Sequence, residues 1–178
     1  MSTRACYRFI PNNGPNDDFP GVVTVYKHHD GYPSGAAAAI EAALPHAWQL
    51  PRFEADEFAA AFVRGNKKSA EDYARDYETM AEKTDGDVKQ RDFLLERAQK
   101  YRTDPTYRGL CGGGVRLVPF EGLDAHQRFA SDTEYLYDIR CVDGKLRVTG
   151  YTTSERNDVW TVEKFFEGST KQLARRKP

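Results

Sequence analysis

Alternating apolar and polar positions near the C-terminus predict a β-hairpin. The dipeptide Asp143-Gly144 lies between two alternating runs and favours a two-residue type I′ turn, in which both residues take positive φ. This turn pairs Cys141 with Leu146 on one face and Arg140 with Arg147 on the other. The first face is apolar and is expected to cover the core; it consists of Tyr135, Tyr137, Ile139, Cys141, Leu146 and Val148.

Four more segments have the composition of strands. Residues 6–10 alternate around Arg8, residues 22–26 are apolar and largely β-branched, and residues 115–118 and 160–166 are similar. Together with the helices below, they predict an α+β fold. We expect an antiparallel sheet of about five to six strands with helices on one face.

Helical periodicity predicts two helices in the first third of the chain. Ser34 is expected to cap the first, an alanine-rich helix over residues 34–44, because its hydroxyl can accept from unpaired backbone N–H groups. The second covers residues 54–64, with two phenylalanines on one face and Gly65 as its terminator.

The stretch 66–108 is the most densely charged part of the chain, with 10 basic and 10 acidic side chains. Ser69 begins a capping box for one helix, and Asp85-Gly86 separates this helix from a second one. The two predict an inserted charged helical hairpin with solvated charged faces, which must lie on another surface or pair with a second copy as a homodimer. The second helix is expected to bury Val88, Leu95, Ala98 and Tyr101.

Composition then limits the function classes. At 178 residues the chain has the size of one domain, expected over residues 1–170, and the basic end 171–178 is expected to be disordered. Its 26 basic and 27 acidic residues give a net charge of −1, so nucleic acid is not expected as a main partner. Three scattered cysteines indicate the cytoplasm, and no apolar run is long enough to span a membrane. We expect no cofactor.

The most unusual segment runs from Tyr26 to Gly35, from a strand end through an Asp-Gly turn into a helix. The free N–H groups and the dipole of that helix lie next to basic side chains and could bind phosphate or carboxylate. The two facing arginines of the hairpin could also hold an anion. A plain strand–turn–helix joint and a surface charge mosaic are the simpler interpretations. The candidate ligand-binding residues are Lys27, His28, His29, Asp30, Tyr32, Ser34, Arg140 and Arg147.

Catalysis has two candidate centres. His28 and Asp30 are two apart and could share a face, but a metal site needs a third ligand, from His46, His126 or a distant carboxylate. Cys111 precedes three glycines whose amides could stabilise an oxyanion, although no nearby histidine supplies a base. A turn cap and a hinge are the simpler interpretations, and a metal- or cysteine-dependent hydrolase stays an alternative.

Two motifs carry a family resemblance. The chain begins Met1-Ser2-Thr3-Arg4 and continues with Tyr26-x-x-x-Asp30-Gly31-Tyr32-Pro33-Ser34-Gly35. Both resemble a family of small uncharacterised proteins of bacteriophages, prophages and other mobile elements, which begin M-x-T-R and carry Y-x-x-x-D-G-Y-P-x-G. The likeness covers about the first 45 residues, and 66–108 looks like an insertion relative to shorter members. It implies a bacterial host cytoplasm and a role in modulating host machinery or host defence. The family has no established catalytic residues, so none are carried over to this chain.

We therefore expect a non-enzymatic binding protein of a phage or mobile element. It would modulate or inhibit a host system by contact with a host protein or protein complex, for example as an anti-CRISPR-like inhibitor of host defence, with the charged hairpin as its docking surface. One alternative is a protein that sequesters a small anionic ligand such as a nucleotide, through the Asp30–Gly35 turn with Arg140 and Arg147. The other is the hydrolase.

Overall fold

The computed structural model describes residues 3–12, 21–110, 115–118, 133–156 and 159–176. The chain divides into two compact units. Residues 1–66 and 115–178 form one, called the sheet unit here, and residues 67–114 form the other, called the helical unit.

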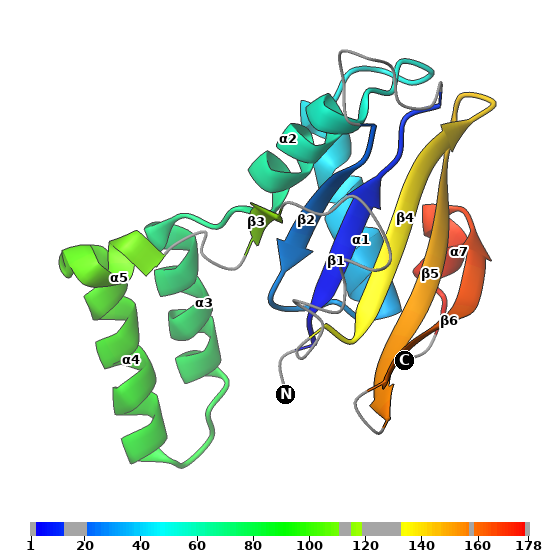
Figure 1. Cartoon of the computed structure of the whole chain (residues 1–178). Coiled ribbons are helices and arrows are strands. Elements are labelled where there is room, and N and C mark those ends of the chain that lie inside the picture. The colour runs from blue at the N-terminus through cyan, green and yellow to red at the C-terminus, as the bar shows by residue number, and fades with distance from the viewer. Residues whose placement is uncertain (1–2, 13–20, 111–114, 119–132, 157–158, 177–178) are drawn as a thin grey trace. The chain divides into compact units, whose positions relative to one another are not determined.

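The sheet unit contains a six-stranded sheet with the order β3-β2-β1-β4-β5-β6 (Figure 1). This confirms the predicted α+β class. One relation differs from the prediction: β1 and β4 run parallel, so the sheet is mixed. Parallel neighbours need a long crossover, and the helices between β1 and β4 in the sequence provide one. The strands are β1 (Ala5–Phe9), β2 (Val23–Lys27), β3 (Val115–Val118), β4 (Tyr135–Val142), β5 (Lys145–Arg156) and β6 (Val159–Gly168).

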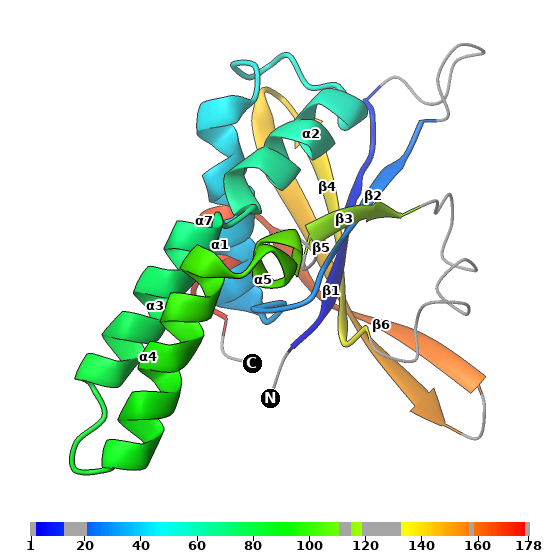
Figure 2. The same ribbon diagram turned by 90° about the vertical axis from the view of Figure 1, so that its left-hand side faces the viewer.

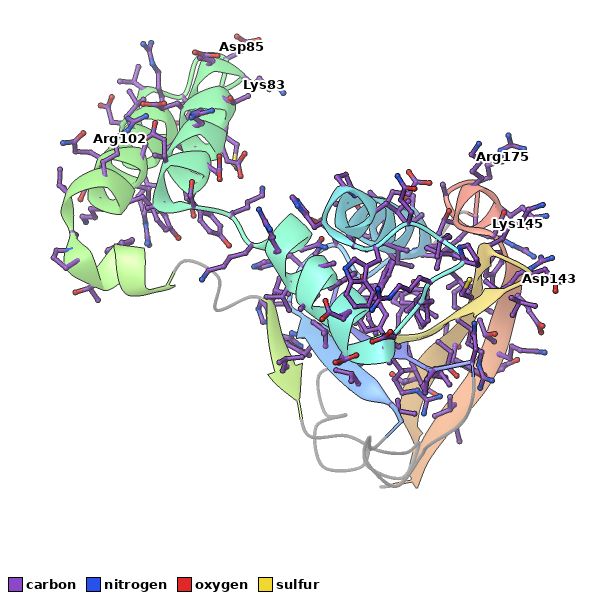
Figure 3. The ribbon with its side chains drawn as sticks, turned by 90° about the horizontal axis from the view of Figure 1, so that it is seen from above. Lys83, Asp85, Arg102, Asp143, Lys145 and Arg175 are labelled. Carbon is purple, nitrogen blue, oxygen red and sulfur yellow. The ribbon has the colours of Figure 1, made fainter. Side chains whose placement is uncertain are left out.

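The β4–β5 hairpin has the predicted turn and register. Asp143 and Gly144 both have positive φ, 50° and 71°, as a type I′ turn requires. Arg140 pairs with Arg147 across the strands, and Cys141 pairs with Leu146. Figure 3 shows the tip of this hairpin at the labels Asp143 and Lys145.

Helices of the sheet unit cover one face of the sheet, as Figure 2 shows. They are α1 (Pro33–Ala43), the short 3₁₀ helix η1 (Leu44–His46), α2 (Ala55–Asn66) and α7 (Thr170–Leu173). The core between helices and sheet includes Tyr7, Phe9, Val25, Ile40, Phe58, Phe62, Tyr137, Ile139, Val148 and Leu173.

Two helix boundaries differ from the sequence-based prediction. The N-cap of α1 is Tyr32, two residues before the predicted Ser34, and Pro33 lies in the first turn, so the Ser34 hydroxyl does not cap the helix. Helix α2 continues through Gly65 to Asn66. A Cβ on Gly65 would lie 2.2 Å from the carbonyl oxygen of Ala42, so glycine serves close helix packing here and does not end the helix.

The basic end of the chain begins with α7 (Thr170–Leu173), a short helix that the sequence pattern did not predict. A capping box begins α7. The Ser169 hydroxyl accepts from the Gln172 N–H, and the Gln172 side chain accepts from the Ser169 N–H. Leu173 is fully buried in the core, which fixes the helix to the sheet unit.

The helical unit is a hairpin of α3 (Ala70–Glu82) and α4 (Val88–Thr103), followed by α5 (Pro105–Leu110). The predicted capping box of Ser69 and Asp72 is present. The turn between α3 and α4 carries Lys83 and Asp85 (Figure 3). The expected buried face of α4 is partly wrong, because Val88 and Leu95 are 68% and 41% exposed. The side chains buried in this hairpin are Ala74, Ala81, Leu94 and Ala98.

Candidate functional site

The segment after β2 forms a tight joint against β1. Asp30 adopts a left-handed backbone conformation, with φ of 57°. The Gly31 N–H then donates to the Thr3 carbonyl at 2.9 Å, and the buried Tyr137 hydroxyl donates to the Gly31 carbonyl at 2.8 Å. The turn is therefore tied to the segment that leads into β1 and to β4.

Packing also explains why this joint contains two glycines. A Cβ on Gly31 would lie 2.8 Å from the Cβ of Ala5, and one on Gly35 would lie 2.3 Å from the Asp30 carbonyl oxygen. Pro33 suits the first turn of α1, where no intrahelical N–H is needed. The spacing Asp-Gly-Tyr-Pro-x-Gly in this chain is thus accounted for by backbone fit, without a ligand.

The basic side chains of the joint are engaged locally. The Tyr26 hydroxyl and the Nδ1 of His28 are hydrogen-bonded at 2.8 Å. Lys27 donates to the His29 carbonyl at 2.6 Å and lies 3.9 Å from the carboxylate of Asp30. Among the described residues, no three His, Cys, Asp or Glu side chains come together as metal ligands. Cys111 and His126 lie outside the described residues.

Arg140 and Arg147 lie on the sheet face opposite the helices. Side chains alternate along a strand, so Tyr137 points to the core and Arg140 points away from it. The Asp30–Gly35 joint accepts from Tyr137 on the core side. The Gly31 end of the joint therefore lies on the core side of the sheet. Tyr26, which is hydrogen-bonded to His28, packs with Leu136 and Tyr151 on the face that carries the two arginines.

A groove of about 570 Å³ contains the two arginines. Asp138, Thr149, Tyr151 and Glu167 also line it. Beside it, Arg8 of β1 donates to both carboxylate oxygens of Asp138 at 2.6 Å, and both side chains are buried. This ion pair could not be found from the sequence, because it depends on the parallel neighbours β1 and β4.

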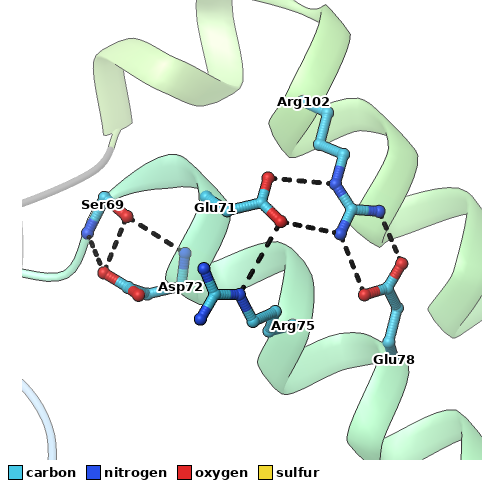
Figure 4. A network of polar contacts seen from close by, with 6 residues as sticks. All are labelled: Ser69, Glu71, Asp72, Arg75, Glu78 and Arg102. Carbon is cyan, nitrogen blue, oxygen red and sulfur yellow. Dashed lines mark hydrogen bonds and ion pairs between the residues drawn. The ribbon is translucent and has the colours of Figure 1, made fainter.

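Arg102 joins the two long helices of the helical unit (Figure 4). Its guanidinium donates to both oxygens of Glu71, at 3.1 and 2.9 Å, and to Glu78 at 2.9 Å. These hydrogen bonds are the main cause that lowers the pKa of Glu71 and of Glu78. We call the side of the hairpin with Glu71, Arg75, Glu78 and Arg102 the charged side.

The opposite side of the hairpin is rich in aromatic residues, which the sequence analysis did not recognise. Tyr73 stacks on Tyr101 with ring centroids 5.1 Å apart, and Tyr77 stacks on the same ring at 5.7 Å. Arg97 lies over Phe93 and over Tyr107. Spacings of three and four residues place these side chains on one side of each helix. This aromatic side consists of Tyr73, Tyr77, Met80, Phe93, Arg97, Tyr101 and Tyr107.

Comparisons with protein-family models, with curated proteins and with solved structures found no match for this chain. In the described part of the chain, no helix combines the length and the apolar character needed to cross a membrane.

Proposed function

We propose that this chain is a non-enzymatic binding protein that docks on a protein partner through the aromatic side of its helical unit. The observation that carries the proposal is the exposure of two large apolar side chains there. Met80 is 53% exposed and Phe93 is 52% exposed, beside half-buried tyrosines and Arg97.

The composition of this side supports a protein interface. Tyrosine, phenylalanine, methionine and arginine are enriched in the contact regions of protein complexes, and tyrosine and arginine are frequent hot spots. The charged side has the opposite character, since its carboxylates are occupied by Arg102, which links α3 to α4. We therefore assign the docking surface to the aromatic side, not to the charged faces that the sequence suggested.

The partner follows from the family resemblance. The motifs of the first 45 residues resemble proteins of phages and mobile elements, which favours a protein of the bacterial host as the target. Inhibition of a host defence system, in the manner of an anti-CRISPR protein, is the specific form of this proposal. Arg97 at the centre of the aromatic side favours a partner surface that combines apolar and acidic residues.

The proposal is tested by affinity capture from host lysate with the full chain and two matched variants. Phe93→Asp places a charge on the aromatic side, whereas Val88→Asp makes a similar change at an exposed apolar residue of the same helix. Val88 lies in the first turn of α4 and points about 140° away from Phe93 around the helix axis, by the regular helix geometry of 3.6 residues per turn. Aspartate suits the first turn of a helix. We expect host proteins that the wild type and Val88→Asp retain and that Phe93→Asp loses.

Two results would contradict the proposal. One is the same set of captured proteins for all three forms when circular dichroism shows that all are folded. The other is a dimer of the chain itself that Phe93→Asp converts to monomers in analytical ultracentrifugation, because the aromatic side would then be covered by a second copy.

A further inference from the structure

The groove on the sheet face opposite the helices holds two positively charged side chains that are bonded to neither of its carboxylates. Arg140 and Arg147 occupy directly opposed positions on the neighbouring strands β4 and β5. Like charges at such positions repel each other and destabilise a sheet. In the described part of the chain, neither arginine has an ion pair or a side-chain hydrogen bond.

The acidic side chains of the groove are already occupied. Both oxygens of Asp138 accept from Arg8. Glu167 accepts from Lys164 at 3.0 Å. Neither carboxylate is therefore bonded to the arginine pair, and an anion from outside would supply the missing charge.

The rest of the lining fits an organic anion of small size. A volume of about 570 Å³ lies within the usual range of small-molecule sites, about 300–1,000 Å³. The Thr149 hydroxyl adds a hydrogen-bonding group. Tyr151 packs against an apolar cluster of Cys6, Tyr26 and Leu136, so its ring offers a supported surface at another part of the groove.

We propose that Arg140 and Arg147 bind the phosphate group of a small phosphorylated ligand, with Tyr151 in contact with the organic part of that ligand. Two guanidinium groups present planar pairs of N–H donors that match phosphate oxygens. This site lies in the sheet unit and is independent of the docking surface on the helical unit, so either proposal can fail without the other.

The first test measures thermal unfolding of the full chain in inorganic phosphate and in chloride of equal ionic strength. Phosphate is expected to raise the melting temperature of the wild type. Arg140→Ala and Arg147→Ala should weaken phosphate binding by about 10- to 100-fold, the loss expected for a charged hydrogen bond. Arg175→Ala, at an exposed arginine of the C-terminal segment, is the matched control and should respond as the wild type does.

Folding does not confound this test. Each arginine is exposed and faces a like charge, so its removal should leave the melting temperature in chloride unchanged or slightly higher. Glu167→Gln removes a negative charge from the groove and should tighten phosphate binding. Equal melting temperatures in phosphate and chloride, or a phosphate response that survives Arg147→Ala, would overturn the proposal.

A second test separates free phosphate from a phosphorylated organic ligand. Isothermal titration calorimetry compares the four nucleoside 5′-monophosphates with inorganic phosphate, and adenosine is the uncharged control. The nucleotides should bind more tightly than inorganic phosphate does. Tyr151→Ala should reduce nucleotide affinity to that of phosphate. If phosphate binds as tightly as every nucleotide, the assigned role of Tyr151 is wrong and the site is one for inorganic phosphate.

Discussion

Two buried tyrosines of the sheet unit differ in one hydrogen bond. Tyr7 and Tyr137 are both fully buried, and their rings stack with centroids 5.4 Å apart. The Tyr137 hydroxyl donates to the Gly31 carbonyl at 2.8 Å. The Tyr7 hydroxyl is buried without a hydrogen-bond partner among the described residues. A buried polar group without a partner costs free energy, so the two hydroxyls should affect stability in opposite directions.

We predict that Tyr7→Phe raises the free energy of unfolding by about 1 kcal/mol, because it removes an unsatisfied buried hydroxyl. Tyr137→Phe should lower it by about 1 kcal/mol, because it leaves the Gly31 carbonyl without its donor. Urea unfolding of the two variants and the wild type measures both changes. A similar loss of stability in both variants would show that the Tyr7 hydroxyl has a stabilising partner.

Single residues were predictable from the sequence where their role is local. Asp143-Gly144 fixed the hairpin register, and that register alone placed Arg140 opposite Arg147. Roles that depend on distant chain segments were not predictable. The Tyr137 hydroxyl donates to the Gly31 carbonyl, 106 positions away in the sequence. Arg8 donates to Asp138, 130 positions away. Neither contact leaves a spacing pattern in the sequence.

At the scale of elements, α1 and α2 approach each other closely at Gly65. Gly65 lies inside α2, where alanine would normally stabilise a helix by about 1 kcal/mol relative to glycine. A Cβ at this position would meet the Ala42 carbonyl oxygen of α1 at 2.2 Å, and this oxygen belongs to backbone that cannot turn away. The contact geometry and the helix propensity therefore oppose each other.

We predict that the clash with the Ala42 carbonyl outweighs the gain in helix propensity. Gly65→Ala should therefore lower the melting temperature of the chain. Thermal unfolding followed by circular dichroism measures the change. Ala60→Gly, at an exposed position of the same helix, is the control and should cost about 1 kcal/mol by propensity alone. A Gly65→Ala variant that is more stable than the wild type would show that α1 and α2 can separate easily at this point.

The bounds of the helices were predictable from the sequence within a few residues, but the buried face of α4 was not. In α4 the spacing of Val88 and Leu95 suggested a buried stripe, whereas Leu94 and Ala98 are the buried pair. Both sets have helical spacing, and only the position of α3 selects between them. The aromatic side was missed for a related reason: the contacts of Tyr73 and Tyr77 with Tyr101 depend on the pairing of two helices and not on the pattern of one.

At the scale of the whole molecule, the carboxyl groups with a lowered pKa and the tyrosines with a raised pKa lie in different units. The carboxyl groups with a lowered pKa in the described part of the chain are Glu71, Asp72, Glu78 and Glu96, all in the helical unit. Their main causes are hydrogen bonds from Arg102, Ser69 and Lys100. These carboxyl groups bind protons less readily in the folded helical unit than in the unfolded chain. Its stability is therefore fully present above the ordinary value of 4.5 for glutamate, and it falls as pH drops through the lowered pKa values.

The described tyrosines with a raised pKa are Tyr7, Tyr137 and Tyr151, all in the sheet unit, and burial is the main cause for each. The folded sheet unit keeps their protons when the unfolded chain releases them. Its stability is therefore complete below the ordinary tyrosine value of 10.0 and falls as pH rises above it. The slope is about 1.4 kcal/mol per pH unit for each fully buried tyrosine.

We predict that acid weakens the helical unit first and alkali weakens the sheet unit first. The chain offers a direct readout, because its two tryptophans, Trp48 and Trp160, both belong to the sheet unit, while far-UV circular dichroism reports the helices of both units. In urea unfolding between pH 3 and 11, Arg102→Ala should reduce the acid dependence seen by circular dichroism, because Glu71 and Glu78 lose the partner that lowers their pKa. The alkaline dependence of tryptophan fluorescence should stay unchanged. Tyr7→Phe should reduce only the alkaline dependence, since it removes one titrating hydroxyl from the sheet unit. Each substitution could instead alter the acid and the alkaline dependence of the free energy of unfolding to the same extent. This result would contradict the prediction, because it would show that the two units unfold together.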